Sequence, residues 1–276
     1  DRVGLPAART VRGGHTFAHR AADLEALVGR PRDLRQATGA PFDRSVSAVI
    51  STNRAHELDT VADNMARQSL RESGELQVVL VLHGLDVDVA DVEARFRERG
   101  IDQLVVVPAD SSLTLGACLN LGIDASDGAH VAKIDDDNFY GRHYLLDLVD
   151  ALDYSGAGIA GKWAHYTWLR STGAVILRFP RSEHRFERLV QGGSILMQGE
   201  VARRLRFSDL PRAVDTDLLN RAQAAGVRTY SSDRFNYVSI RGTDRHAHTW
   251  TVSDATFMTA TGRLLFHGDP RDHVSI

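Results

Sequence analysis

The chain has 276 residues, 43% of them hydrophobic and 25% charged, which is the composition of an ordinary globular protein. A collagen-like chain, a disordered chain and a disulfide scaffold are excluded, the last because Cys118 is the only cysteine. The formal net charge of −3 supplies no global basic field, so we predict no nucleic-acid partner. This length suits one large α/β domain or two small ones.

The apolar segments are too short to cross a membrane. The longest ones, Val78–Leu82 and Val105–Val107, are strand-sized, whereas a membrane span needs roughly 20 apolar residues. We therefore predict no transmembrane segment and a cytoplasmic location, with peripheral binding at the inner face of the membrane as an open alternative.

Residues 1–44 are rich in Arg, Ala, Gly and Pro and read as an N-terminal lead-in segment. Only Ala21–Val28 has the composition of a short helix. From residue 45 the pattern changes to strands alternating with helices. The predicted strands are Ser45–Ser51, Leu76–Leu82, Gln103–Val107 and Ala129–Ile134, and the predicted helices are Ala55–Leu70, Val89–Arg99 and Leu113–Ile123. This alternation predicts right-handed βαβ units and a parallel sheet.

After Asp137 the alternation loosens. We predict helices at Tyr144–Leu152 and Thr216–Ala225, and strands at Gly158–Gly161, Gly173–Phe179, Phe186–Val190 and Ser194–Gln198 and near Thr229 and Val238. The segment Gly156–Lys162 fits the first seven residues of a phosphate-binding P-loop. However, Trp163 stands where that loop needs Ser or Thr, so we interpret the segment as a glycine-rich strand.

The most informative motif is an acidic run at the end of a buried strand. Its residues are Lys133, Ile134, Asp135, Asp136, Asp137 and Asn138. Adjacent carboxylates raise one another's pKa, and a divalent cation removes that cost. Because Mg²⁺ and Mn²⁺ prefer carboxylates combined with substrate phosphates, the run indicates a cation and a diphosphate. A solvated acidic turn that caps the next helix is the alternative.

Three segments together resemble family 2 glycosyltransferases across residues 45–240. The segment Ser51–Arg54 resembles their nucleotide-binding turn, Leu115–Gly122 resembles the helix before the fourth strand, and Asp135–Asp137 matches their DxD motif. The resemblance implies the GT-A fold, an α/β architecture. It consists of a Rossmann-like, mainly parallel sheet flanked by helices, with a smaller mixed sheet on the acceptor side.

The resemblance also implies a domain organisation and an activity. Residues 45–250 would form the catalytic domain, with a nucleotide-binding half at 45–138 and an acceptor half at 139–250, followed by a C-terminal extension at 251–276. The implied reaction is metal-dependent, inverting transfer of a sugar from a nucleotide-diphosphate sugar to a hydroxyl acceptor, such as a saccharide. Such a hexosyltransferase would serve polysaccharide or other glycoconjugate synthesis.

The same resemblance implies roles for the residues of the donor site. It assigns Asp135 to the ribose or the metal and Asp137 to the metal, Mn²⁺ or Mg²⁺, while Asp136 supports the backbone geometry of the donor site. The remaining implied donor contacts are Ser51, Thr52, Arg54, Glu57, Asn120 and Lys133. Period-two alternation places Lys133 on the same sheet face as Asp135, where it can pair with the acidic run or with the diphosphate.

A second acidic cluster, Asp215 and Asp217, opens a predicted helix. It resembles the glutamate–aspartate motif of the family, whose aspartate is the general base, and the resemblance assigns that role to Asp215. Val214 stands in the usual place of the glutamate, which leaves Asp217 as a competing base. Both residues could also cap the helix, because acidic groups complement the dipole in the first turn.

Two further features complete the implied site. His248 is the implied histidine ligand of the metal, with His246 as second choice. Gly192 and Gly193 resemble the acceptor-side loop of the family, where small residues allow the backbone to approach a sugar or phosphate, and a plain turn is the alternative.

Two other function classes stay open at this point. A nucleotidyltransferase or a metal-dependent phosphohydrolase acting on a nucleotide-sugar would also use acidic residues at a strand end. Hydrolases usually need a second set of metal ligands, and nucleotidyltransferases need a glycine-rich loop after the first strand, which Ser51–Arg54 is not. A non-catalytic sugar- or nucleotide-binding module is disfavoured by the two acidic clusters.

Overall fold

The computed structural model describes residues 2–28, 43–242 and 262–276, which fall into two units. The first consists of the described residues up to Asp43 together with Ile276, and the second consists of those from Arg44 to Ser275. The first unit holds two helices, α1 (Gly4–Gly14) and α2 (Phe17–Leu27), neither of which has a buried residue. The Thr16 side chain caps α2 by accepting a hydrogen bond from the His19 N–H, so this helix begins four residues before the predicted one.

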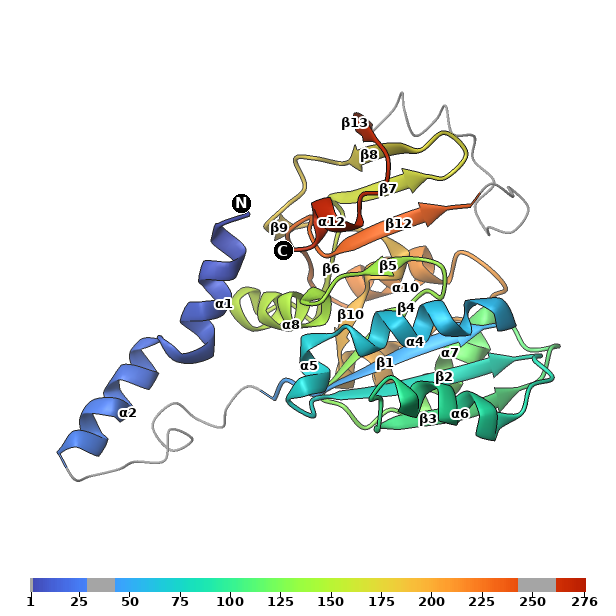
Figure 1. Cartoon of the computed structure of the whole chain (residues 1–276), viewed down its shortest axis with the longest axis horizontal. Helices are drawn as coiled ribbons and strands as arrows, with labels where there is room; N and C mark the ends of the chain where they lie inside the picture. The colour runs from blue at the N-terminus through green and yellow to red at the C-terminus, as the bar shows by residue number, and fades with distance from the viewer. Residues whose placement is uncertain (1, 29–42, 243–261) are drawn as a thin grey trace. The chain divides into compact units, whose positions relative to one another are not determined.

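The second unit is built on an eight-stranded mixed sheet with the order β3-β2-β1-β4-β10-β6-β11-β9 (Figure 1). The strands are β1 (Val46–Thr52), β2 (Leu76–His83), β3 (Leu104–Ala109), β4 (His130–Ile134), β6 (Ile159–Gly161), β9 (Arg185–Phe186), β10 (Leu196–Gln198) and β11 (Thr229–Ser231). The first four are mutually parallel, as predicted, whereas β10 runs antiparallel to both β4 and β6. The carboxyl ends of β1 to β4 therefore lie along one edge of the sheet, where ligands bind in open α/β folds.

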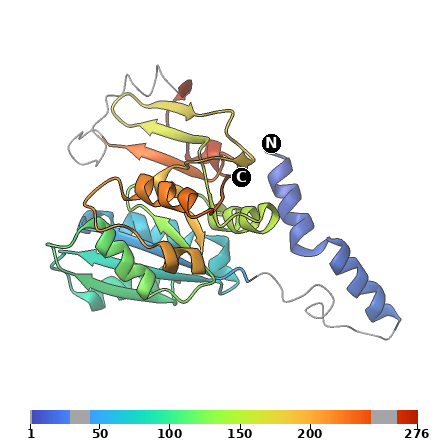
Figure 2. The ribbon, with the colours of Figure 1, turned by 180° about the vertical axis from the view of Figure 1, so that it is seen from behind.

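Helices cover both faces of this sheet. The helices are α4 (Leu58–Ala66), α5 (Ser69–Glu72), α6 (Val89–Glu98), α7 (Leu115–Asp124), α8 (Tyr144–Ser155), α9 (Gly199–Leu205) and α10 (Val214–Ala224). Apolar side chains of α4, α6 and α8 form one core with the sheet, and those of α7, α9 and α10 form another on the opposite face. Figure 2 shows the face that carries α7 and α10.

The predicted helix Ala55–Leu70 is interrupted. The structure has a 3-10 turn, η1 (Ala55–Glu57), followed by α4 and α5, with Gln68 in an extended conformation between the two α-helices. The buried Gln68 side chain donates hydrogen bonds to the carbonyls of Asn64, at 3.1 Å, and Gly141, at 2.9 Å. Tertiary contacts therefore end α4, although the apolar spacing continues to Leu70.

A smaller mixed sheet with the order β13-β8-β7-β12-β5 completes the unit. Its strands are β5 (Phe139–Tyr140), β7 (His165–Leu169), β8 (Ala174–Arg178), β12 (Tyr237–Arg241) and β13 (Gly262–His267), and α12 (Arg271–Val274) follows. The predicted strand Phe186–Val190 is wrong beyond β9, because the chain leaves the edge of the large sheet and turns Val190 into the core against Gly161. None of the helices in the described parts of the chain has both the length and the apolarity that a membrane span needs.

Candidate active site

A buried lysine ties the two acidic clusters together at the carboxyl edge of the large sheet. Lys133 lies near the end of β4, and its Nζ atom is 2.6 Å from Asp135 Oδ1 and 3.3 Å from Asp215 Oδ1. The same ammonium group donates to the carbonyl of Gly192 at 3.2 Å. Burial alone would lower the pKa of Lys133, but the charges of the two aspartates outweigh it and raise this pKa above its ordinary value.

Asp135 is half-buried and is fixed from several sides. Its backbone N–H donates to the Tyr140 hydroxyl at 2.8 Å, and its Oδ2 atom accepts from Asn138 Nδ2 at 3.2 Å. The pKa of Asp135 is raised to about 6, mainly by burial, although the charge of Lys133 acts to lower it. The negative charges of Asp215 and Asp137 also raise this pKa, so three carboxylates influence one another here.

The middle carboxylate of the run, Asp136, faces the turn after β1. It is buried, accepts a 2.6 Å hydrogen bond from Thr52 Oγ1, and is held by Nε and Nη2 of Arg54. Arg54 also reaches Asp137 Oδ2 at 3.0 Å. These contacts fix the acidic run to the turn after β1 and bring Thr52 and Arg54 together with the aspartates; their roles at a donor site stay a prediction.

Two glycines bring the backbone against the carboxylates. A Cβ atom on Gly192 would lie 2.6 Å from Asp215 Cγ, and one on Gly193 would lie 2.7 Å from Asn138 Nδ2 and overlap Asp135. The loop is held by Tyr140, whose hydroxyl donates to the Gly193 carbonyl at 2.8 Å. The glycines are therefore required for close approach, which a plain turn would not need.

Asp215 and Asp217 point to different surroundings, although both lie in the first turn of α10. Asp215 Oδ1 is buried, has no hydrogen-bond partner and faces Lys133. Asp217 accepts from Ser208 Oγ at 2.6 Å and Arg221 Nε at 2.8 Å, and these two bonds lower its pKa. Asp215 thus belongs to the acidic edge, whereas Asp217 is engaged within its own helix and the preceding loop.

The other residues assigned from sequence are more dispersed. Asn120 on α7 binds the backbone of Phe207 twice, at 2.8 and 2.9 Å, and so anchors the segment after α9. The Ser51 side chain hydrogen-bonds the thiol of Cys118, and Glu57 lies 3.7 Å from His56 Nε2. His246 and His248 lie outside the described residues.

The donor atoms near Asp135 are compatible with a divalent cation. Among the described residues, no three His, Cys, Asp or Glu side chains form a metal-binding group. Yet Mg²⁺ and Mn²⁺ are usually bound by one or two carboxylates together with substrate phosphates. Asp135 and Asp137 provide two such carboxylates whose charges repel each other, and the charge of Asp215 acts on Asp135 as well.

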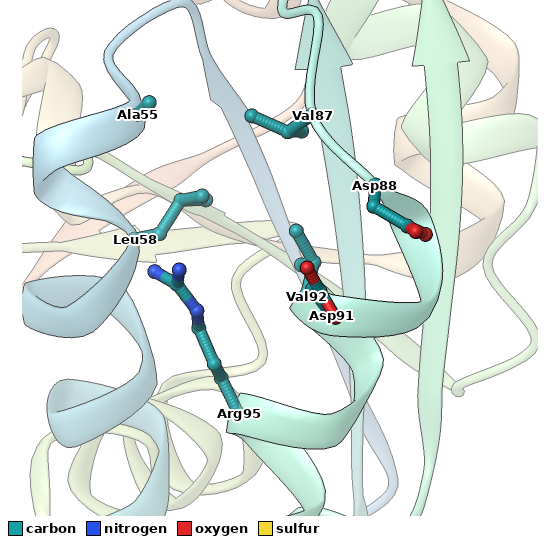
Figure 3. A pocket seen from close by; sticks show the side chains of 7 residues that line it. All are labelled: Ala55, Leu58, Val87, Asp88, Asp91, Val92 and Arg95. Carbon is teal, nitrogen blue, oxygen red and sulfur yellow. The ribbon is translucent and has the colours of Figure 1, made fainter.

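A pocket of about 160 Å³ opens at the same edge of the sheet, beyond β1 and β2. Figure 3 shows it between α4 and α6, with the Arg95 side chain extending toward Leu58. Its lining residues are Ala55, Leu58, Val87, Asp88, Asp91, Val92 and Arg95. The clustered aspartates do not line this pocket, so the pocket is separate from the carboxylates. The turn after β1 connects the two, because Ala55 lines the pocket and its neighbour Arg54 binds Asp136.

Sequence reasoning missed two tyrosines and a glutamine that position the site. Tyr237, on β12, donates to Gln191 Oε1 at 2.6 Å, and the same oxygen accepts from the Gly193 N–H. Burial raises the pKa of Tyr237 and Tyr140 well above the ordinary value, which keeps both hydroxyls protonated. Their positions in the sequence could have indicated this role, because Tyr140 follows the acidic run closely and Gln191 directly precedes the two glycines.

Solved structures of other proteins share this architecture. TarS from S. aureus, in complex with UDP-GlcNAc, has a TM-score of 0.58 and 16% sequence identity over 76% of this chain. The mannosyltransferase PcManGT from Pyrobaculum calidifontis, in complex with GDP-Man and Mn²⁺, has a TM-score of 0.56 and 17% identity over 86% of this chain and 68% of its own. No protein-family model matches the sequence, and no curated protein matches it either.

At these identities the likeness shows a shared fold. The predicted fold class is therefore confirmed: an α/β protein with a mainly parallel sheet and a second, smaller mixed sheet. The match spans 62% of the TarS chain.

Proposed function

We propose that this protein is a metal-dependent, inverting glycosyltransferase that moves a sugar from a nucleotide-diphosphate donor to a hydroxyl group of a saccharide or related acceptor. The observation that carries the proposal is the convergence of Asp135, Asp137 and Asp215 around Lys133 at the carboxyl edge of the sheet. The fold shared with a mannosyltransferase solved with GDP-Man and Mn²⁺ supports it. We further propose membership of the family 2 enzymes, with Asp135–Asp137 as the DxD motif.

In this proposal Asp135 and Asp137 hold the divalent cation together with the donor diphosphate. Bound there, the cation supplies Lewis-acid stabilisation of the leaving diphosphate. Lys133 acts to lower the pKa of Asp135 and adds a positive charge at the place where negative charge develops. Arg54 and Thr52 fix the acidic run through Asp136, so this carboxylate positions the turn and does not bind the donor itself.

Asp215 is the proposed general base. Its Oδ1 atom is buried and faces the Lys133 ammonium group at 3.3 Å, at the edge where the other two carboxylates lie. The base takes the proton of the acceptor hydroxyl as that oxygen attacks the anomeric carbon. Because one displacement joins acceptor and sugar with no covalent intermediate, the anomeric configuration inverts. Asp217 is the weaker candidate, since Ser208 and Arg221 occupy it.

The pocket between α4 and α6 is the proposed site of part of the nucleoside. It lies beyond the carboxyl ends of β1 and β2, and Ala55 and Leu58 in its wall flank Glu57. Apolar walls with a few charged groups at the rim suit a heterocyclic base.

A thermal-shift screen with UDP, GDP, ADP and CDP, each with and without Mn²⁺, tests the proposal. A nucleotide at 100 times its Kd stabilises the folded protein by about 2.7 kcal/mol, and Mn²⁺ should be required for this effect. The Asp137→Ala variant should lose both the stabilisation and sugar transfer. Turnover that persists in the presence of a metal chelator, or no response to any nucleotide, would overturn the proposal.

A further inference from the structure

The helix α2 of the N-terminal unit presents apolar side chains to solvent. Phe17, Ala21, Leu24 and the C-cap residue Val28 follow one another at intervals of four, three and four residues, which brings them to one side of the helix. The exposed fractions are 96% for Phe17, 64% for Leu24 and 70% for Val28, and Ala21 is exposed as well. We call these four residues the α2 stripe.

The contacts that partly cover α2 are made away from this stripe. His19 and Ala22, on the far side of the helix, are partly buried, whereas every residue of the α2 stripe is exposed. A helix as short as α2 is marginal in water on its own, and most helical stability in proteins comes from packing of an apolar face. The α2 stripe is therefore suited to a partner.

The spacing of the α2 stripe is that of a coiled coil, in which the apolar a and d positions alternate at intervals of three and four residues. With Ala21 at an a position and Leu24 at a d position, Arg20 occupies g and Glu25 occupies e, so opposite charges flank the stripe. Arg20 also lies 3.2 Å from Asp23 on its own helix, but both side chains are exposed and such pairs contribute little.

These flanking charges favour one partner and one orientation. In a parallel pair of identical helices, a g residue faces the e residue of the following heptad on the other helix, so Arg20 would meet Glu25 on both sides of the seam. In an antiparallel pair the two arginines would face each other. The charges are therefore complementary to a second copy of α2 that runs in the same direction.

A lipid surface fits the same charges poorly. Helices that lie on anionic membranes carry Lys and Arg beside their apolar face. In α2 the single arginine stands against two acidic residues, Asp23 and Glu25, so the helix is negatively charged when its histidine is neutral.

We propose that the α2 stripe pairs with the same stripe of a second copy of this chain, as a parallel two-helix coiled coil, so that the protein dimerises through its N-terminal unit. The contact is two-fold symmetric and closes on itself. Because α2 has only about three turns, the interface is small and the dimer forms in a concentration-dependent way. The inference is independent of the proposed function.

Sedimentation velocity of the full 276-residue chain tests the proposal, over roughly 1–300 µM because a small interface associates weakly. We expect the average mass of the wild type to rise toward twice that of the monomer. Leu24→Glu places a charge in the α2 stripe and should stay monomeric over the whole range. Since Leu24 is exposed, this variant should unfold at the same temperature as the wild type when both are dilute.

Ala26→Glu is the matched control, because Ala26 is exposed on the far side of the same helix and the variant adds the same charge. It should dimerise as the wild type does. A wild type that is monomeric at every concentration, or a Leu24→Glu variant that dimerises as readily as the wild type, would overturn the proposal.

Charge exchange tests the orientation. Glu25→Arg and Arg20→Glu each place like charges across the seam and should weaken dimerisation by roughly tenfold, and the double variant should restore it. A double variant that is as weak as the single ones would contradict the parallel pairing. Cosedimentation with vesicles of phosphatidylglycerol and phosphatidylcholine covers the other partner: a monomeric wild type that binds vesicles through Leu24 would assign the α2 stripe to a lipid surface and overturn the proposal.

Discussion

The ammonium group of Lys133, on β4, lies 3.3 Å from the carboxylate of Asp215, at the beginning of α10. This ion pair joins the parallel half of the sheet to the helix that carries the proposed base. The chain has one other lysine, Lys162, and it is also buried and paired, with Asp233 at 3.0 Å. One pair lies among carboxylates that influence one another, and the other lies in the core.

Replacing Lys133 by methionine should destabilise the protein in a way that a divalent cation relieves. The variant leaves the charges of Asp135, Asp137 and Asp215 uncompensated, so we expect the free energy of unfolding to fall by about 2–3 kcal/mol. This loss is smaller than the roughly 3–5 kcal/mol expected when a fully buried pair is broken, because the carboxylates here are partly exposed. Urea unfolding with and without Mn²⁺ measures this.

The Lys162→Met variant is the control for that experiment. Both partners of the Lys162–Asp233 pair are fully buried, so the expected loss is about 3–5 kcal/mol, and Mn²⁺ should not restore it. Equal recovery of the two variants in Mn²⁺ would contradict a specific cation site at Asp135.

The two glycines beside the carboxylates should tolerate no side chain. In Gly193→Ala the new Cβ would displace Asp135, and in Gly192→Ala it would displace Asp215. A shift of about 1 Å in a catalytic group can reduce the rate about 100-fold, so we expect losses of this order in kcat with a folded protein by circular dichroism. Gly13→Ala, where nothing lies within 4 Å, should leave kcat unchanged. Full activity of Gly193→Ala would show that Asp135 needs no fixed position.

Asparagine substitutions separate the two candidate bases. Asp215→Asn should lower kcat by about 10²–10⁴-fold, the usual contribution of a general base. Asp217→Asn removes the negative charge beside Arg221 but keeps an oxygen that can accept from Ser208 and Arg221, so it should mainly lower stability, with kcat within a few-fold of wild type. Sugar-transfer kinetics measure kcat, and thermal unfolding measures stability, for both variants. A large loss of kcat in Asp217→Asn but not in Asp215→Asn would assign the base to Asp217.

Much of the large sheet could be predicted because its strands are continuous β-branched runs alternating with amphipathic helices. The location of Asp135 at a strand end follows from the same pattern. The pairing of Lys133 with Asp215 could not be predicted, since it depends on the crossing of β10 between β4 and β6, which no local signal specifies. The base assignment from resemblance remains a prediction.

The small sheet was harder to predict for a physical reason. In β7 both faces are buried, so polar residues such as His165 and Thr167 alternate with aromatic ones without the usual polar outer face. The segment Phe186–Val190 was predicted to be a strand, although Leu189 and Val190 enter the core from a loop. A strand was predicted near Val238, where β12 lies, but the contact of Tyr237 with Gln191 in the glycine loop joins distant segments and was missed.

Filling the pocket between α4 and α6 should weaken nucleotide binding. Ala55 is exposed at the pocket wall in η1, so Ala55→Trp adds a large ring there without disturbing the core. We expect the Kd for the preferred nucleoside diphosphate to rise at least tenfold, because the ring competes with the base. Isothermal titration in Mn²⁺ measures the Kd, and an unchanged value would place the base elsewhere.

His165 should make the protein less stable in acid. Burial, together with the nearby charge of Arg178, lowers its pKa from 6.5 to about 3, so the folded protein keeps the ring neutral between these two values. Between these two values the unfolded chain binds a proton that the folded chain does not. The free energy of unfolding therefore falls by about 1.4 kcal/mol for each pH unit below 6.5 from this group alone.

His165→Gln removes this contribution, so urea unfolding at pH 7, 6 and 5 should show the wild type losing about 2 kcal/mol relative to the variant by pH 5. Parallel curves for the two proteins would show that the ring is protonated as readily in the fold as in the unfolded chain.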